Sequence, residues 1–105
     1  MVFLETKIFT RHITELLPDD EYRQLQQELV AHPEKGAVIP GSGGIRKLRW
    51  GIGNRGKRGG VRFIYYWAKG HDQCLMLFVF AKNETEDLTK SQVEQLRAVV
   101  EKEYP

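Results

Sequence analysis

Hydrophobic residues in the first third of the chain recur at helical spacing. A short apolar stretch at 2–5 could form a strand, and a helical pattern with Thr6 as possible N-cap follows it. Pro18 ends that pattern, and a second one begins after it and stops at Pro33. Its apolar face would comprise Tyr22, Leu25, Leu29 and Val30. These patterns predict a strand followed by two helices joined by a tight corner, an αα-hairpin.

The middle of the chain has the residue types of β-strands. Stretches rich in β-branched and aromatic residues predict strands at 45–50, 61–68 and 74–81. The glycine-rich link 51–60 and the turn 69–73 are too short for crossover helices, so these strands should pair as an antiparallel meander. The third strand is nearly all apolar and should be covered on both faces.

A last helical pattern spans about 89–103. Thr89 and Gln92 match a capping box at its start, as do Ser91 and Glu94. The order of elements predicts a single α+β domain over the whole chain of 105 residues. In that fold a small antiparallel sheet is flanked by an N-terminal helical hairpin and a C-terminal helix.

Basic residues gather in the middle of the chain. The net charge is only +2, but nine Lys and Arg lie between Lys35 and His71, where there is no Asp or Glu. The flanks hold all 14 acidic residues and the other seven basic ones. A cationic block held on a sheet favours a polyanion partner, above all nucleic acid, over a solvated basic surface.

Composition and motifs exclude several classes of protein. A single cysteine rules out an internal disulfide, and no apolar stretch approaches the ~18 residues of a membrane span. The N-terminus lacks the features of a signal peptide, so we expect a cytoplasmic protein with no membrane partner. Glycines at 51, 53 and 56 resemble a dinucleotide fingerprint, but a strand follows them where that motif needs a helix. Scattered histidines and a lone Cys74 suggest neither a metal site nor a Cys/His nucleophile, and we expect no cofactor.

Strand alternation sorts the central charges into two faces. Lys47 and Arg49 share one face of the first basic strand, while Arg46 lies on the other. Arg62 begins one face of the next strand, two pleats from Tyr66. If the faces align, Lys47, Arg49 and Arg62 project together on the open side of the sheet.

Converging cations suit a phosphate whose negative charge grows in a transition state. RNA can be cut without a metal, because its own 2′-OH can attack the adjacent phosphate while the protein positions the strand and moves protons. Lys47, or Lys82 at the end of the third strand, could act as base or acid when crowded by arginines. Glu84 could shuttle a proton or pair with Arg62.

RNA would also need contacts away from the reacting phosphate. An aromatic side chain can stack on a base, and cations on a flexible loop can touch further phosphates. The residues that we assign to RNA binding are Arg46, Arg55, Lys57, Arg58, Tyr66 and Asn83.

Three segments carry a resemblance to a known family. They are the strand G-I-R-K-L-R-W, the run K-R-G-G-V-R-F-I-Y-Y and the run F-A-K-N-E-x-x-D-L. Together with the order of elements, they resemble the RelE superfamily of toxins, and most closely the HigB-type branch of type II toxin–antitoxin systems. The resemblance implies a ribosome-dependent mRNA endoribonuclease that cleaves the codon in the A site by 2′-OH attack, without metal.

The resemblance also implies the site residues. The family's catalytic cations before the glycine loop fall on Lys47 and Arg49, and its arginine at the start of the next strand falls on Arg62. A basic position after the third strand falls on Lys82 or Asn83.

This chain departs from the family pattern at one position. The tyrosine that some members carry after the third strand has no counterpart, since Asp87 and Leu88 stand there. The identity of the general acid and base therefore stays open, and Tyr66 could supply the stacking.

The resemblance further implies partners. A small antitoxin, usually a DNA-binding protein from the same operon, would neutralise the toxin, and the pair would bind operator DNA. The toxin itself would bind the ribosome and mRNA.

Two other functions fit the same residues. One is a non-catalytic RNA- or ribosome-binding module with the same basic sheet. The other is a protein-interaction domain whose cationic face binds an acidic partner. Phosphate contacts predict a strong dependence on salt for either nucleic-acid function.

Overall fold

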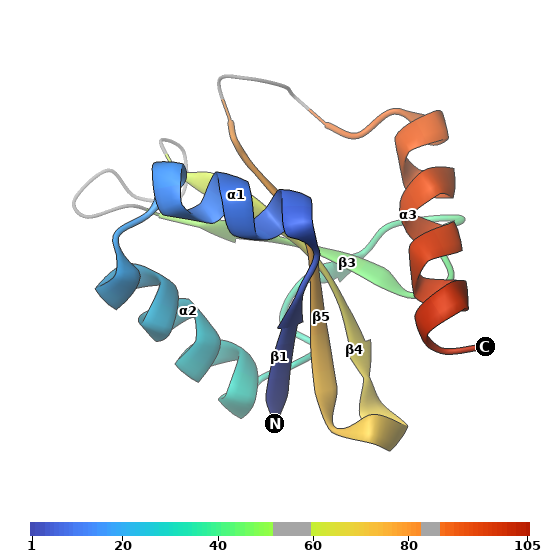
Figure 1. Cartoon of the computed structure of the whole chain (residues 1–105), viewed down its shortest axis with the longest axis horizontal. Helices are drawn as coiled ribbons and strands as arrows, with labels where there is room; N and C mark the ends of the chain where they lie inside the picture. Colours follow the sequence, from blue (N-terminus) through green and yellow to red (C-terminus); the bar gives the residue numbers. More distant parts are fainter. Residues whose placement is uncertain (52–59, 83–86) are drawn as a thin grey trace.

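A five-stranded sheet with helices on both faces makes up the part of the chain that the computed structural model describes, residues 1–51, 60–82 and 87–105 (Figure 1). The elements in chain order are β1 (Val2–Glu5), α1 (Lys7–Leu16), α2 (Asp19–Ala31), β2 (Ala37–Val38), β3 (Ile45–Trp50), β4 (Val61–Ala68), the 3-10 turn η2 (Lys69–His71), β5 (Gln73–Ala81) and α3 (Lys90–Glu103). The predicted α+β class is confirmed, with the helical hairpin and the C-terminal helix in their expected places.

The sheet has the strand order β1-β5-β4-β3-β2 and is mixed, not wholly antiparallel as predicted. β3, β4 and β5 form the expected antiparallel meander. β1 adds to it in parallel with β5, from Val2 opposite Gln73 to Glu5 opposite Met76. β2 was not predicted, because two residues are too few to show a strand's alternation. Because β1 and β4 pair with its two edges, β5 lies inside the sheet, and it is buried on both faces, as its apolar sequence predicts.

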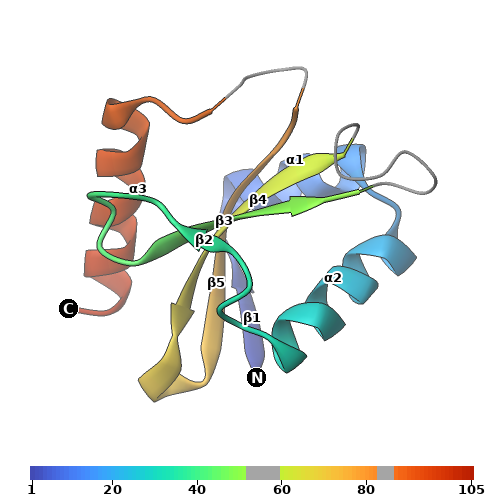
Figure 2. The same ribbon diagram turned by 180° about the vertical axis from the view of Figure 1, so that it is seen from behind.

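The two faces of the sheet are covered by different helices. Figures 1 and 2 show α1 and α2 on one side and α3 on the other. The larger core cluster joins α1 and α2 to the sheet through Phe9, Ile13, Leu17, Leu25, Leu29, Leu48, Val61, Phe63, Tyr65, Cys74, Met76 and Val79. The smaller cluster, under α3, is formed by Ile45, Ile64, Leu75, Leu77, Phe80 and Val100. Only Val100 of α3 is fully buried, so this helix covers its face lightly.

A β-bulge sets which side chains of β5 reach each core. Ile64 lies opposite Phe78 and Tyr65 opposite Met76, which leaves Leu77 as the extra residue. Leu77 and Phe78 consequently both pack on the α3 side, against strict alternation. The carbonyl oxygen of Leu77 accepts a hydrogen bond from the Thr6 hydroxyl at 2.8 Å.

The predicted N-cap of α1 is confirmed, and so is one of the two capping boxes predicted for α3. Thr6 caps α1, and its hydroxyl oxygen accepts from the Phe9 N–H at 3.1 Å. Thr89 caps α3 through the capping box with Gln92, which the structure selects over the alternative pair. The prediction that Val30 lies on the buried face of α2 is wrong: it is 55% exposed, because Leu29 takes the buried position beside it.

The buried Tyr65 joins β4 to the loop after α2. Its hydroxyl accepts from the Gly36 N–H at 2.9 Å and donates to the Pro33 carbonyl oxygen at 2.8 Å. In Tyr65→Phe this acceptor would be lost from a buried N–H, so we expect the free energy of unfolding to fall by about 1–3 kcal/mol. Urea denaturation measures the loss. Tyr104→Phe is the control, because the half-buried Tyr104 hydroxyl bonds only to a side chain in the contacts described, that of Gln73; equal losses in both variants would contradict the role of Tyr65.

Candidate functional site

Three cations share the face of the sheet that α3 covers. Arg49 and Arg62 lie directly opposite each other on β3 and β4, and Lys47 lies opposite Ile64, two residues further along. Leu48 packs in the core on the other side, so alternation puts its neighbours Lys47 and Arg49 on the α3 side with Ile64. The predicted alignment of Lys47, Arg49 and Arg62 is therefore found, but on the side that α3 covers and not on an open side of the sheet. We call these three residues the cationic face.

Arg62 is the most buried member of the cationic face, with 6% of its surface exposed. Burial, together with the facing charge of Arg49, lowers the pKa of the Arg62 guanidinium. An arginine still keeps its charge at ordinary pH, so it cannot serve as a base. One guanidinium nitrogen donates to the Val61 carbonyl oxygen at 3.3 Å. The side chain is thus held by the fold before any ligand arrives.

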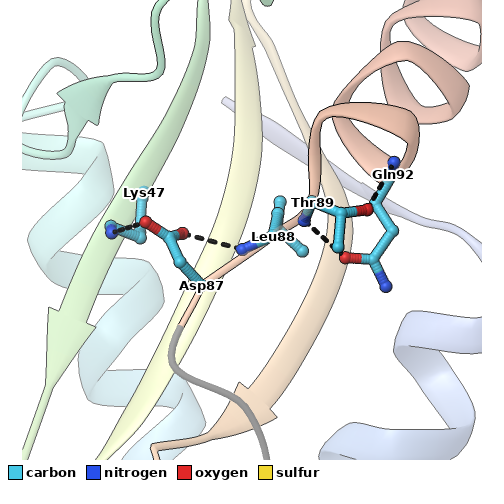
Figure 3. A network of polar contacts seen from close by, with 5 residues as sticks. All are labelled: Lys47, Asp87, Leu88, Thr89 and Gln92. Carbon is cyan, nitrogen blue, oxygen red and sulfur yellow. Dashed lines mark hydrogen bonds and ion pairs between the residues drawn. The ribbon is translucent and has the colours of Figure 1, made fainter.

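An acidic side chain reaches the cationic face from the segment before α3. The Asp87 carboxylate pairs with the Lys47 ammonium at 3.2 Å, and its second oxygen accepts from the Leu88 N–H at 2.8 Å. Figure 3 shows these contacts running on into the Thr89–Gln92 cap of α3. The sequence did not indicate this contact, because forty positions separate Lys47 from Asp87 and only the return of the chain brings them together.

The surroundings of Asp87 favour its charged form. Burial alone would raise the pKa of the Asp87 carboxyl, but the Leu88 N–H, Lys47 and Arg49 outweigh that effect and hold the pKa below its usual value. The carboxylate is therefore negative at neutral pH and reduces the positive charge of the cationic face.

Lys82 lies at the Arg62 end of the sheet. It follows directly after β5, is exposed, and donates its backbone N–H to the Gly60 carbonyl oxygen at 3.3 Å. Gly60 is required there, because a Cβ would lie 1.8 Å from the carbonyl oxygen of Trp50. Arg62 faces Phe80, two residues before Lys82. The backbone of Lys82 thus lies at the end of β5 nearest to Arg62, and its role at the rim of the cationic face stays a prediction.

Two residues assigned to RNA binding pack against other parts of the fold. Arg46 is on the opposite side of β3, where its guanidinium donates to the carbonyl oxygens of Glu34 and Gly36 at 3.0 and 2.7 Å. Tyr66 packs in the α3-side cluster, and its ring centre lies 5.7 Å from that of Tyr104. Their positions link the loop after α2 and the end of α3 to the sheet, and we leave them out of the proposed site.

The remaining predicted site residues lie outside the described residues. They are Arg55, Lys57, Arg58, Asn83 and Glu84. Their assignments to RNA binding, and for Glu84 to proton transfer, stay predictions from the sequence.

Other kinds of site find little support in the described part of the chain. Burial raises the pKa of the Cys74 thiol to about 12, which disfavours a thiolate nucleophile. His71 is exposed and its ring lies against Tyr104, with centres 4.9 Å apart. Among residues 1–51, 60–82 and 87–105, no three His, Cys, Asp or Glu side chains gather as metal ligands would. No helix within these ranges has the length and apolar character to cross a membrane.

Comparison with known protein families agrees with the α+β fold. The family model described as the RelE toxin of the RelE/RelB toxin–antitoxin system matches residues 1–104, which is nearly the whole chain. Toxins of this family are generally RNases, and membership of the family implies a cognate antitoxin. On this match, the chain belongs to the RelE toxin family.

Proposed function

We propose that this protein is a ribosome-dependent mRNA endoribonuclease of the HigB-type branch, which inhibits translation by cleaving the codon in the A site. The observation that carries the proposal is the pairing of Arg49 and Arg62 across two strands, with Lys47 on the same face. The two guanidinium groups face each other across the strands, so their positive charges act on the same place. A phosphate bound there would be attracted by both.

The reaction that suits this face needs no group beyond the RNA and the protein. The 2′-oxygen of one nucleotide forms a bond to the adjacent phosphorus, and the bond from phosphorus to the 5′-oxygen breaks. The products are a 2′,3′-cyclic phosphate and a free 5′-OH. The pentavalent intermediate carries more negative charge than the substrate, so cations fixed in advance at a partly buried site stabilise it more strongly.

Proton transfer must accompany the phosphate chemistry. A base takes the proton of the 2′-OH, and an acid gives one to the leaving 5′-oxygen. Arg49 and Arg62 stay charged and act on the phosphate, so Lys47 and Lys82 are our candidates for the proton-transfer steps. Glu84 remains a further candidate from the sequence.

The same proposal names the partners. We infer that mRNA in the ribosome is the substrate, with Arg55, Lys57, Arg58 and Asn83 as further RNA contacts. A DNA-binding antitoxin from the same operon would neutralise the toxin and carry it to operator DNA. The protein would act in the cytoplasm, where translation takes place.

A non-catalytic RNA- or ribosome-binding module is the second candidate. The absence of a counterpart to the tyrosine that some family members carry favours it, because Asp87 and Leu88 stand where that acid or stacking group would be. Such a module would use the same cationic face and would inhibit translation by occupancy alone.

One experiment separates these functions. The protein is induced in cells, and primer extension follows a translated message and the same message without its start codon. We expect cuts in the translated message only, because the ribosome presents the codon. Cuts in both messages would mean a free RNase. No cuts in either, with folded and abundant protein, would favour the binding module.

A further inference from the structure

The cationic face contains its own anion. The central segment from Lys35 to His71 has no acidic residue, yet the structure brings Asp87 to within 3.2 Å of Lys47. The negative charge of Asp87 also acts on Arg49. A phosphate that approaches Lys47 and Arg49 therefore meets a carboxylate that already interacts with both.

The ion pair of Lys47 with Asp87 contributes little to the fold. The Lys47 side chain is 22% exposed, but that of Asp87 is 62% exposed, so water reaches the pair from the Asp87 side, and ion pairs that water screens stabilise proteins weakly. The start of α3 has its own capping box, and its other end is held by the buried Val100. A weak ion pair whose acidic partner is exposed can exchange partners without unfolding any element that surrounds it.

We propose that Asp87 is an internal counter-ion of the RNA site, which pairs with Lys47 in the free protein and gives it up when an RNA phosphate binds. Asp87 is then a positioning residue: it holds the Lys47 ammonium on the cationic face and sets a threshold for RNA binding. The inference rests on the proposed function, since it assigns a regulatory contact to the same site.

The exchange follows from charge alone. A phosphate bound among Lys47, Arg49 and Arg62 can interact with all three cations. The Asp87 carboxylate, in contrast, approaches them from the Lys47 side. A polyanion whose phosphates do not fit among the three cations must still displace Asp87, and it gains less binding free energy in return. Asp87 thus raises the selectivity of the site at the expense of its affinity.

The test uses the full chain and ribosomes programmed with a message whose A-site codon carries 2′-O-methyl groups, which blocks attack by the 2′-oxygen. Asp87→Asn keeps the shape of the side chain and an oxygen for the Leu88 N–H, but removes the charge. We expect it to bind these ribosomes about threefold to tenfold more tightly than the unmodified protein. On a cleavable message KM should fall, with kcat little changed.

A matched control removes the same charge elsewhere. Glu101→Gln breaks the exposed pair of Glu101 with Arg97 on α3, at 2.9 Å, and changes the net charge equally. We expect less than about a twofold gain in affinity from this variant. In a Lys47→Met background, the gain from Asp87→Asn should shrink toward that of Glu101→Gln, because the competition for Lys47 is gone.

Three outcomes would count against the inference. Equal gains from Asp87→Asn and Glu101→Gln would show that only net charge matters. A loss of kcat in Asp87→Asn at saturating ribosomes would place Asp87 in the chemistry itself. If the unmodified protein neither binds programmed ribosomes nor cuts mRNA, the proposed function fails, and the inference fails with it.

Discussion

Arg62→Gln should remove nearly all RNA cleavage while the protein stays folded. Arg62 faces Arg49 across the strands and is 6% exposed, so its charge acts in a partly water-excluded setting. Loss of one fixed donor to a developing oxyanion costs roughly 100- to 1,000-fold in kcat. Glutamine keeps polar atoms at the position, so the far-ultraviolet circular dichroism and the unfolding midpoint should change little.

The measurement is single-turnover cleavage of programmed ribosomes, with purified variants at matched concentration. Arg97→Gln is the matched control, since it removes an exposed arginine from α3 and should retain cleavage within about twofold. Near-normal cleavage by folded Arg62→Gln would refute our assignment of the site. Equal loss of cleavage in both variants would show that overall charge, and not the cationic face, governs activity.

Phe9→Ala should cost more stability than any other single change proposed for this protein. Phe9 is fully buried at the junction of α1, α2 and the sheet, and its ring centre lies 5.7 Å from that of Tyr22 and 6.0 Å from that of Phe63. Truncation of a buried phenylalanine removes apolar contacts and leaves a cavity, which costs about 3–5 kcal/mol. Domains of this size are stable by only about 5–15 kcal/mol, so the variant should be close to unfolding at 37 °C.

The neighbouring residue supplies the control for this prediction. Ile8 is 42% exposed, and Ile8→Ala should lower the free energy of unfolding by about 1 kcal/mol or less. Urea denaturation of the two variants compares them directly. A similar loss in both would mean that α1 does not form the core contact that its periodicity predicts.

Local chemistry explains which parts of the fold were predictable. The strands at 45–50 and 61–68 begin and end where the sequence places them, because alternation and turn residues lie within the segments themselves. Thr6 was recognisable as a cap from its residue type, and Thr89 with Gln92 was one of two capping pairs that the sequence offered for the last helix. Such features need no knowledge of the rest of the chain.

Features that depend on distant partners were not predictable. The parallel pairing of β1 with β5 and the bulge at Leu77 are set by how remote segments meet. The short β2 forms because its two residues pair with the edge of β3. Sequence patterns indicate which face of a single helix or strand is buried, but they do not indicate which other elements it contacts.

The candidate site divides in the same way. Lys47, Arg49 and Arg62 could be aligned from the sequence, since two alternating strands joined by one link must pair as neighbours. Asp87 could not, because its contact with Lys47 depends on where the chain returns after β5. Tyr66 lies on the expected face, but the aromatic ring of Tyr104 packs beside it, and nothing near Tyr66 in the sequence indicates this.

Residues 2–6 can reach their final positions only after the chain has been made as far as residue 77, because their partners lie at 73–77. Thr6 donates its hydroxyl to Leu77, 71 positions later, and Val2 lies opposite Gln73. Contacts between such distant positions close late and slow folding. During synthesis β1 leaves the ribosome well before β5, so this edge of the sheet can close only after residues 73–77 have been made. Until it does, the outer edge of β5 stays open, so a nascent chain passes through a stage in which it is prone to pair with other strands.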